Sequence, residues 1–352
     1  ARFNLDPKQD LFFFKTLHSL ALAMTDIRTD QVMQPEHYRE LGKSIGVNLG
    51  AAADNRFSDI PETQKSSDPI LGLINLAILR KVPLRTQYNI SQIDESWNVV
   101  KYVDEALTKY KKSYTLYDFT DMLRVFAETG QSCCPRFAVT FLDEAQDLSP
   151  LQWDIAHMLD RQSERMYCAG DDDQAIYRWA GADVDQFIGL EGGSETLSQS
   201  YRVPQLPWEI AQNVARRIHR RFPKTYKPRD ERGMVRRISM VNELDMSEGS
   251  WLILAQAAYL LQDVSSDLKA MGLLFNFRGH RSVSERMSEA INGWEQLRKD
   301  KEISGRAVKS IYSYMSSKDR IKRGFKKLGG LEEDEMFSFD VLVKDYGLLA
   351  TK

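Results

Sequence analysis

The stretch "RFAVTFLDEAQDLSPLQWDIAHMLDRQSERMYCAGDDDQ", residues 136–174, decides the fold. Two short apolar runs, "FAVTFL" and "RMYCAG", flank a segment with helical spacing, "SPLQWDIAHMLDRQ". A strand, a helix and a second strand in this order are typical of a βαβ unit, in which the two strands run parallel. The stretch therefore predicts an α/β fold built on a parallel sheet.

The segments around this unit extend the pattern. Residues 11–24 read as an apolar strand that runs into a helix, and residues 25–112 as a more polar, mainly helical block with a turn-rich stretch at 48–69. A second strand-and-helix pattern follows at 249–275, and residues 276–352 are helical and strongly charged. We expect two α/β cores, each with a helical accessory block.

Composition limits the class of protein. The chain has 352 residues, of which 42% are hydrophobic and 28% charged, with a net charge of −2. Such a chain is typical of a soluble protein with more than one domain, and any polyanion must bind at local patches. The three cysteines form no metal-binding spacing, and no apolar run approaches the roughly 20 residues of a membrane span. We expect a cytoplasmic protein with no membrane partner.

Asp143 and Glu144 follow directly after the first strand of the βαβ unit. In open α/β sheets ligands collect at the carboxyl ends of the strands, where one carboxylate can hold Mg²⁺ and its neighbour can polarise a water molecule. The alternative is a helix N-terminus, where acidic residues stabilise the dipole without a ligand.

The second strand ends at the same predicted edge of the sheet. It is followed by three aspartates, 171–173, and by Gln174, whose amide can both donate and accept hydrogen bonds. Trp179 comes shortly after and either packs in the core or provides a platform for a nucleic-acid base. Two polar strand ends side by side favour a nucleotide site over a simple surface turn.

These residues carry a resemblance. "LDEAQDLSPLQ", "AGDDDQAIYRWAGA" and "LSQSYRVP" are similar, in order and spacing, to motifs II, III and IV of superfamily 1A DNA helicases of the UvrD/Rep/PcrA type. "FKTLHSLA" resembles their motif Ib, and "LYDFTDML" the segment that re-enters the first motor domain after its insert. The likeness spans about residues 10–275.

The resemblance implies a fold and a domain plan. The fold is the RecA-like, P-loop NTPase type, with parallel-sheet motor domains that carry helical accessory subdomains. Residues 1–20 and 113–200 would form the first motor domain (1A) around a helical insert (1B) at 21–112. Residues 201–275 would belong to the second motor domain (2A), and 276–352 to a helical accessory domain (2B).

For the nucleotide, the resemblance implies ATP and Mg²⁺ as cofactors. Asp143 would hold the metal, Glu144 would be the base that activates the hydrolytic water, and Gln174 would contact the γ-phosphate. Tyr201 would stack on the adenine, and Arg202 would act as an arginine finger, a role that suits a planar guanidinium in phosphoryl transfer.

For DNA, the resemblance implies that Trp179 stacks on a base and that Thr16 and His18 touch the backbone. His18 could equally make a satisfied polar contact within the protein. The family reads WRGA where this chain has an alanine at 180, so one arginine is missing, and Arg178 is a candidate substitute.

Two basic runs add to the DNA side. Residues 216–237 hold ten lysines and arginines against two acids, and residues 318–327 hold six against one. Such clusters bind phosphates through counterion release, although a solvated helix face has the same composition. In the first run we expect DNA contacts from Arg216, Arg217, Arg220 and Arg221.

The resemblance implies an ATP-dependent helicase or translocase that acts on single-stranded DNA and at single-strand/duplex junctions, with 3′–5′ polarity, in repair, replication or recombination. The P-loop GxxxxGK[ST] is missing: the one Gly-Lys-Ser, 42–44, has His37 where the first glycine belongs. Motifs V and VI are missing as well, so we expect an internal portion of a longer helicase that is inactive by itself. The alternatives are a non-catalytic DNA-binding scaffold and the motor part of a helicase–nuclease.

Overall fold

The computed structural model describes residues 11–49, 68–277, 279–316, 319–325, 328 and 331–349. Residues 1–10 of the predicted first motor domain and 50–67 of the predicted insert lie outside the described residues, as do Lys318, Lys326 and Lys327 of the second basic run. The chain divides into two compact units, Ala1–Arg236 and Arg237–Lys352.

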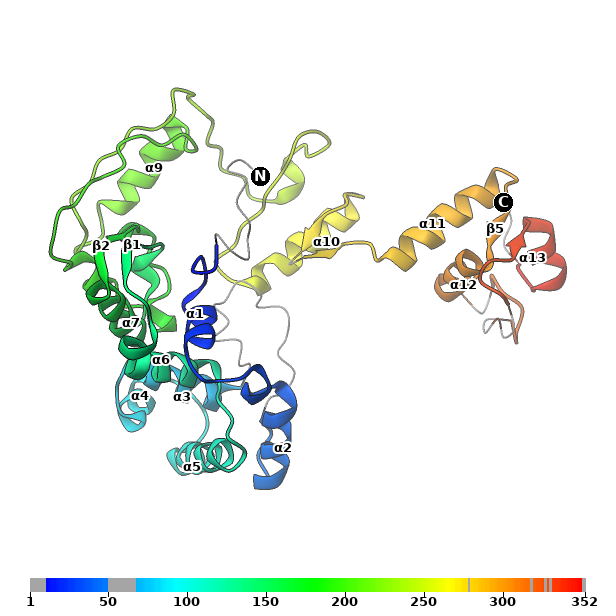
Figure 1. Ribbon diagram of the computed structural model, residues 1–352. Helices are drawn as coiled ribbons and strands as arrows, with labels where there is room; N and C mark the ends of the chain where they lie inside the picture. Colours follow the sequence, from blue (N-terminus) through cyan, green and yellow to red (C-terminus); the bar gives the residue numbers. More distant parts are fainter. Residues whose placement is uncertain are drawn as a thin grey trace. The chain divides into compact units, whose positions relative to one another are not determined.

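The first unit is mainly helical around a small parallel sheet (Figure 1). Its helices and strands are α1 (Leu17–Met24), α2 (Pro35–Ile45), α3 (Pro69–Leu79), α4 (Leu84–Ile90), α5 (Trp97–Tyr114), α6 (Phe119–Cys133), β1 (Phe137–Leu142), α7 (Pro150–Arg161), β2 (Ser163–Cys168), α8 (Val184–Ile188) and α9 (Gln205–Ala215). Short 3-10 turns join them: η1 (Thr29–Gln31), η4 (Ala145–Asp147), η5 (Asp172–Gln174) and η6 (Arg178–Ala180).

The predicted βαβ unit is present. Strands β1 and β2 pair in parallel, from Phe137 opposite Ser163 to Leu142 opposite Cys168, and α7 connects them. The α/β class is thus shown as a mixed structure with a small parallel sheet. The full RecA-like architecture and the limits of its subdomains stay predictions.

Three apolar clusters hold the first unit together. One joins α1, α6 and α7 through residues such as Ala21, Phe126 and Ile155. A second lies within the predicted insert, where α2, α3 and α5 share a core. A third contains Leu142 and Trp153 and supports the carboxyl end of β1. That end of the sheet is therefore packed against a buried apolar cluster.

The N-terminal apolar run differs from the prediction of a strand. Residues 11–13 form a turn and α1 starts at Leu17, with Thr16 as its N-cap. Leu17, Leu20 and Ala21 recur at helical spacing and pack against α6 and α7, whereas Phe14 is 85% exposed. The spacing of the buried residues decides for a helix.

The second unit contains residues 249–275, which are predicted to begin with another strand. Residues 251–255 do not form a strand, and Leu252 and Leu254 are 82% and 80% exposed. A strand needs a hydrogen-bonded neighbour, and among the described residues none pairs with this segment. The boundary between the two compact units also falls inside the predicted second motor domain.

The remainder of the second unit is mainly helical, with two short antiparallel pairs of strands. Its elements are η7 (Val241–Glu243), η8 (Ala258–Leu260), α10 (Leu261–Ala270), β3 (Asn276–Phe277), β4 (His280–Arg281), α11 (Glu285–Arg298), β5 (Ile303–Ser304), α12 (Gly305–Tyr314), β6 (Met336–Phe337) and α13 (Phe339–Asp345). Helices α11, α12 and α13 share a core that includes Leu297, Val308 and Leu342. Among the described residues, no helix is both long enough and apolar enough to cross a membrane.

Candidate functional site

The two strand ends meet at one edge of the sheet, as the sequence predicts. Past the end of β1, the Ala169 N–H donates to the Leu142 carbonyl at 2.7 Å, and the Ala145 N–H donates to the Ala169 carbonyl at 2.9 Å. These bonds carry the pairing beyond both strands. They bring the 143–147 turn beside the 170–174 turn.

A buried glutamine joins the two turns. Gln146 is 1% exposed, and its Nε2 donates to Glu144 Oε2 at 2.7 Å while its Oε1 accepts the Asp171 N–H at 3.1 Å. Asp171 Oδ2 in turn accepts a hydrogen bond from Gln174 Nε2 at 2.6 Å. The predicted base and the predicted γ-phosphate contact therefore belong to one hydrogen-bonded network, Glu144–Gln146–Asp171–Gln174.

Gly170 makes room for this network. A Cβ at this position would lie 2.5 Å from Gln146 Oε1 and 3.0 Å from the Phe187 ring. Any side chain here would push the Gln146 amide away from the second turn. The glycine before the three aspartates is thus required by the close approach of Gln146.

Glu144 has a left-handed backbone, with φ 52° and ψ 40°. For a residue with a Cβ this conformation costs on the order of 1–3 kcal/mol, and such residues gather at functional sites. Helix α7 is capped by Ser149, whose N–H and hydroxyl both donate to Gln152 Oε1 at 2.9 Å. Glu144 itself directly precedes the short 3-10 turn η4 and makes no side-chain capping hydrogen bond to it.

Asp143 is exposed, and its Oδ1 accepts the Glu144 N–H at 3.0 Å. No group of three or more His, Cys, Asp or Glu side chains in the described part of the chain is arranged to hold a metal ion. Mg²⁺ in nucleotide sites is commonly held by one or two carboxylates together with phosphate oxygens and water. A single exposed carboxylate at a strand end fits that kind of site.

Asp147 ends the short turn η4 that follows the predicted base. Its Oδ1 is buried without a hydrogen-bond partner among the described residues. Burial and the negative charge of Glu144 raise the pKa of Asp147 to about 6. The Asp147 carboxyl group therefore changes charge near pH 6.

The three aspartates of the second turn are paired with two cations of the basic run. Lys224 Nζ lies 2.9 Å from Asp171 Oδ1 and 3.2 Å from Asp173 Oδ2, and it also contacts Asp172. Arg221 pairs with both oxygens of Asp173, at 2.8 and 2.5 Å. Burial alone would raise the pKa of Asp171, but the bonds from Gln174 and Lys224 outweigh it and lower that pKa.

The predicted nucleotide contacts in motif IV, Tyr201 and Arg202, are not part of this network. Tyr201 is 85% exposed and Arg202 is also exposed. In the described part of the chain neither makes a hydrogen bond or ion pair to Glu144 or Gln174. The predicted roles of Tyr201 and Arg202 therefore require a nucleotide that reaches from the network to these two side chains.

Trp179, the predicted base platform, is 59% exposed in the short turn η6. Arg80, at the end of α3, donates to the carbonyl of Arg178 at 2.9 Å and so braces the turn before the tryptophan. Gly181 follows with φ 102° and packs on α3. Arg178 itself pairs with Asp185 at 3.3 Å. An indole face open to solvent suits stacking on a base.

The residues of the predicted motif Ib lie at the start of α1. The Thr16 hydroxyl caps this helix by accepting the Ser19 N–H at 3.3 Å. The His18 ring meets Phe119 edge to face, with 6.0 Å between ring centroids. Both residues thus make contacts within the protein, and their DNA contacts stay predictions.

Four arginines of the basic run fall into two classes, two without an ion pair in the described structure and two that are paired with an aspartate. Arg216 and Arg217 are exposed, and Arg220, also exposed, lies 3.4 Å from Asp185. The Arg221 side chain is only 19% exposed because of its pair with Asp173. The sequence alone does not separate these two classes.

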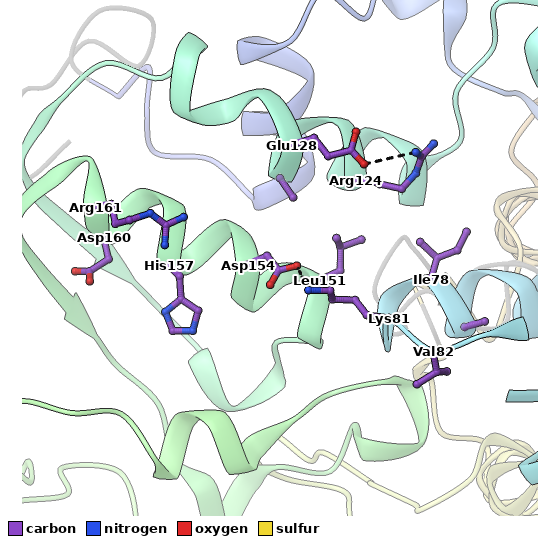
Figure 2. Close-up of a pocket in the computed structure, with 12 residues that line it drawn as sticks. Ile78, Lys81, Val82, Arg124, Glu128, Leu151, Asp154, His157, Asp160 and Arg161 are labelled. Atoms are coloured by element: carbon purple, nitrogen blue, oxygen red, sulfur yellow. Dashed lines mark ion pairs between the residues drawn. The ribbon is translucent and has the colours of Figure 1, made fainter. Parts of the chain in front are cut away.

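A cleft of about 850 Å³ lies between α3, α6 and α7 and includes none of the predicted site residues (Figure 2). Its wall carries charges of both signs, including a Lys81–Asp154 pair at 2.6 Å and an Arg124–Glu128 pair at 3.7 Å. His157 of α7 also lines it. The cleft is separate from the strand-end network.

The sequence predicts no individual role for three residues of the site, Gln146, Lys224 and Arg80, although Lys224 lies in the basic run 216–237 that is expected to bind DNA. Gln146 had a signal, because a lone amide between acids directly after a strand has to be bonded if it is buried. Lys224 and Arg80 act across 52 and 98 residues of chain, and nothing in their local sequence points to those partners.

A family model described as the UvrD/REP helicase N-terminal domain matches residues 10–192, just over half of the chain. The Bacillus subtilis protein YjcD is 24% identical over 235 residues, which are 63% of this chain and 30% of the relative. The ATP-dependent DNA helicase PcrA of Leuconostoc citreum is 24% identical over 231 residues, 61% of this chain and 30% of the relative. DNA helicase II of Rickettsia typhi is 27% identical over 171 residues, 47% and 24% respectively. The chain thus spans less than a third of each relative.

Proposed function

Since the chain belongs to the UvrD/REP helicase family, we propose that it carries part of the ATP-driven motor of a DNA helicase. The motor would translocate 3′–5′ on single-stranded DNA and unwind duplexes at single-strand/duplex junctions. The observation that supports this most directly is the network Glu144–Gln146–Asp171–Gln174 at two parallel strand ends.

The network suits hydrolysis of a phosphoanhydride. Glu144 would take a proton from the attacking water as its oxygen bonds to the γ-phosphorus, and the bond to the β–γ bridging oxygen would break. Gln174 can donate to a phosphate oxygen and accept from that water through one amide. Asp143 would hold Mg²⁺, which neutralises charge on the phosphates when it is bound. Tyr201 and Arg202 of motif IV would complete the site.

On the DNA side, the exposed face of Trp179 would stack on a base, and the exposed arginines of the basic run would contact phosphates. Trp179 is only five residues from Gln174 along the chain. A movement of the 171–174 turn on ATP binding would therefore reach the DNA contact directly. Thr16 and His18 remain candidates for backbone contacts.

The test uses the protein expressed from its complete gene and duplexes with a single-stranded tail at either the 3′ or the 5′ end. The expected result is ATP-dependent unwinding of the 3′-tailed duplex, with the 5′-tailed duplex left intact. Preference for the 5′ tail would contradict the polarity. DNA binding with no ATP hydrolysis would instead favour a non-catalytic scaffold.

A further inference from the structure

Lys224 lies inside the basic run, yet it does not share the setting of a DNA-contacting lysine. Its side chain is 12% exposed, and its ammonium group contacts all three carboxylates of the 171–173 turn. Arg216 and Arg217 of the same run are exposed. The Lys224 charge is therefore used in ion pairs within the protein.

The aspartate turn depends on this lysine for its charge balance. Three neighbouring carboxylates repel one another, and the Asp172 side chain is 3% exposed. The Phe222 N–H donates to Asp172 Oδ2 at 2.6 Å, and the Arg221 guanidinium donates to the Asp173 carboxylate. Without Lys224, the buried Asp172 carboxylate would lose its only ion-pair partner among the described residues, and a buried carboxylate without such a partner is strongly unfavourable.

Asp171 connects this balance to the catalytic network. Its Oδ1 faces Lys224, its Oδ2 accepts from Gln174, and its N–H donates to Gln146. Gln146 holds the Glu144 carboxylate. A displacement of Asp171 would consequently shift both the predicted base and the predicted γ-phosphate contact.

We propose that Lys224 is a positioning residue for ATP hydrolysis, which fixes Gln174 and Glu144 by anchoring the 171–173 turn. This inference rests on the proposed function. Lys224 lies downstream of motif IV, and under this proposal it helps to set the geometry of motifs II and III. Under the same proposal, Lys224 and Arg221 do not belong to the DNA-binding surface.

The test is Lys224→Met in the protein expressed from its complete gene. We expect kcat for DNA-stimulated ATP hydrolysis to fall at least about ten-fold, because small misplacements of catalytic groups cost large factors in rate. The KM for ATP and the affinity for single-stranded DNA should stay within about two-fold, since Lys224 would touch neither ligand. Lys224→Arg keeps the charge and should recover most of the rate.

Lys101→Met is the matched control, since Lys101 forms an exposed ion pair with Glu105 in the same compact unit. It should leave kcat unchanged. If Lys224→Met does not fold, the double variant Lys224→Met/Asp172→Asn removes the charge from both partners and serves in its place, with the same fall in kcat expected.

A second readout does not depend on activity. Hydrogen exchange followed by mass spectrometry should be faster in residues 169–176 of Lys224→Met than in the unaltered protein. An unchanged kcat, or weaker DNA binding with a smaller salt slope, would overturn the inference while the proposed function stands. If the unaltered protein hydrolyses no ATP, the proposed function fails and the catalytic role of Lys224 fails with it. Faster exchange would in that case show only that Lys224 anchors the turn.

Discussion

Gly170 and Gln146 show at the scale of single residues how the site is assembled. Gly170→Ala would place a Cβ 2.5 Å from Gln146 Oε1, so the amide has to move and its bonds to Asp171 and Glu144 loosen. We expect a loss of about 1–3 kcal/mol in the free energy of unfolding and a fall of about ten-fold in ATPase rate. Denaturant titration and steady-state ATPase assays of the complete protein measure the two effects.

Gly72→Ala is the control for that variant. Gly72 lies within α3, and a Cβ there would meet no atom within 4 Å. Alanine is favoured over glycine in a helix interior by up to about 1 kcal/mol, so this variant should be at least as stable as the unaltered protein. Equal behaviour of the two alanine variants would mean that Gly170 is not needed for the network.

Asp147 gives a prediction about pH. Its pKa is about 6 in the folded protein against an ordinary value of 3.8, so the folded state binds this proton more tightly than the unfolded state. The associated stability is fully present below about pH 4 and is lost as the pH rises through about 6. Asp147→Asn cannot ionise and should therefore raise the melting temperature at pH 7.5.

The measurement is the difference in melting temperature between Asp147→Asn and the unaltered chain from pH 4 to pH 8. We expect the gain to shrink steadily as the pH falls through 6. A difference that stays constant over this range would show that the Asp147 carboxyl group does not titrate there.

At the scale of elements, the basic run contains two kinds of arginine. Arg216→Ala/Arg217→Ala should weaken single-stranded DNA binding and reduce the slope of log affinity against log salt by about 1.4, because each phosphate contact on a single strand contributes roughly 0.7. Fluorescence anisotropy at several salt concentrations measures both. The added loss from Arg220 and Arg221 should be smaller, since both are paired with aspartates.

Arg39→Ala serves as the control, because Arg39 lies on α2 and pairs with Glu36 on the same helix. It should leave the affinity and the slope unchanged. If the double variant behaves like this control, the run at 216–237 is a solvated surface and not a DNA contact.

The elements that the sequence predicts correctly are those whose signal is local. The βαβ unit at 137–168 combines apolar strands with a helix that starts at a Ser-Pro pair, and each part is recognisable without its neighbours. The strand predicted at 251–255 fails because apolar residues become a strand only beside another strand. The strand predicted at the start of residues 11–24 is wrong because the buried residues begin only after the phenylalanines.

For the whole molecule, the same distinction applies to the site. The edge where Glu144 and Gln174 meet follows from the strand order and could be predicted. The Lys224 and Arg80 contacts could not, because they depend on how distant segments pack. The single Gly-Lys-Ser lies within helix α2 and not in a phosphate-binding loop, as its missing first glycine indicates.

This arrangement predicts the activity of the polypeptide by itself. Residues 1–352 contain no GxxxxGK[ST] motif, so the phosphates of ATP would be enclosed from one side only. We expect the purified polypeptide to hydrolyse ATP very weakly or not at all, in a phosphate-release assay with and without single-stranded DNA. Turnover at the rate of an ordinary helicase would refute this.

The role of Glu144 as the base of an ATPase site is tested by Glu144→Gln in the protein expressed from its complete gene. The change keeps the size of the side chain, so binding of ATP and Mg²⁺ should be nearly intact. The ATPase rate should fall by roughly a hundred- to ten-thousand-fold, because an amide cannot take the proton of the water. Asp143→Asn should differ by weakening Mg²⁺-dependent nucleotide binding as well.

The measurement is the ATPase rate of Glu144→Gln, taken together with its ATP affinity and melting temperature. We expect normal affinity, a normal melting temperature and almost no turnover. Near-normal turnover, with stability lowered by about 0.3–1 kcal/mol, would instead be the behaviour of an acidic residue that only stabilises a helix end. That result would contradict the catalytic role of Glu144.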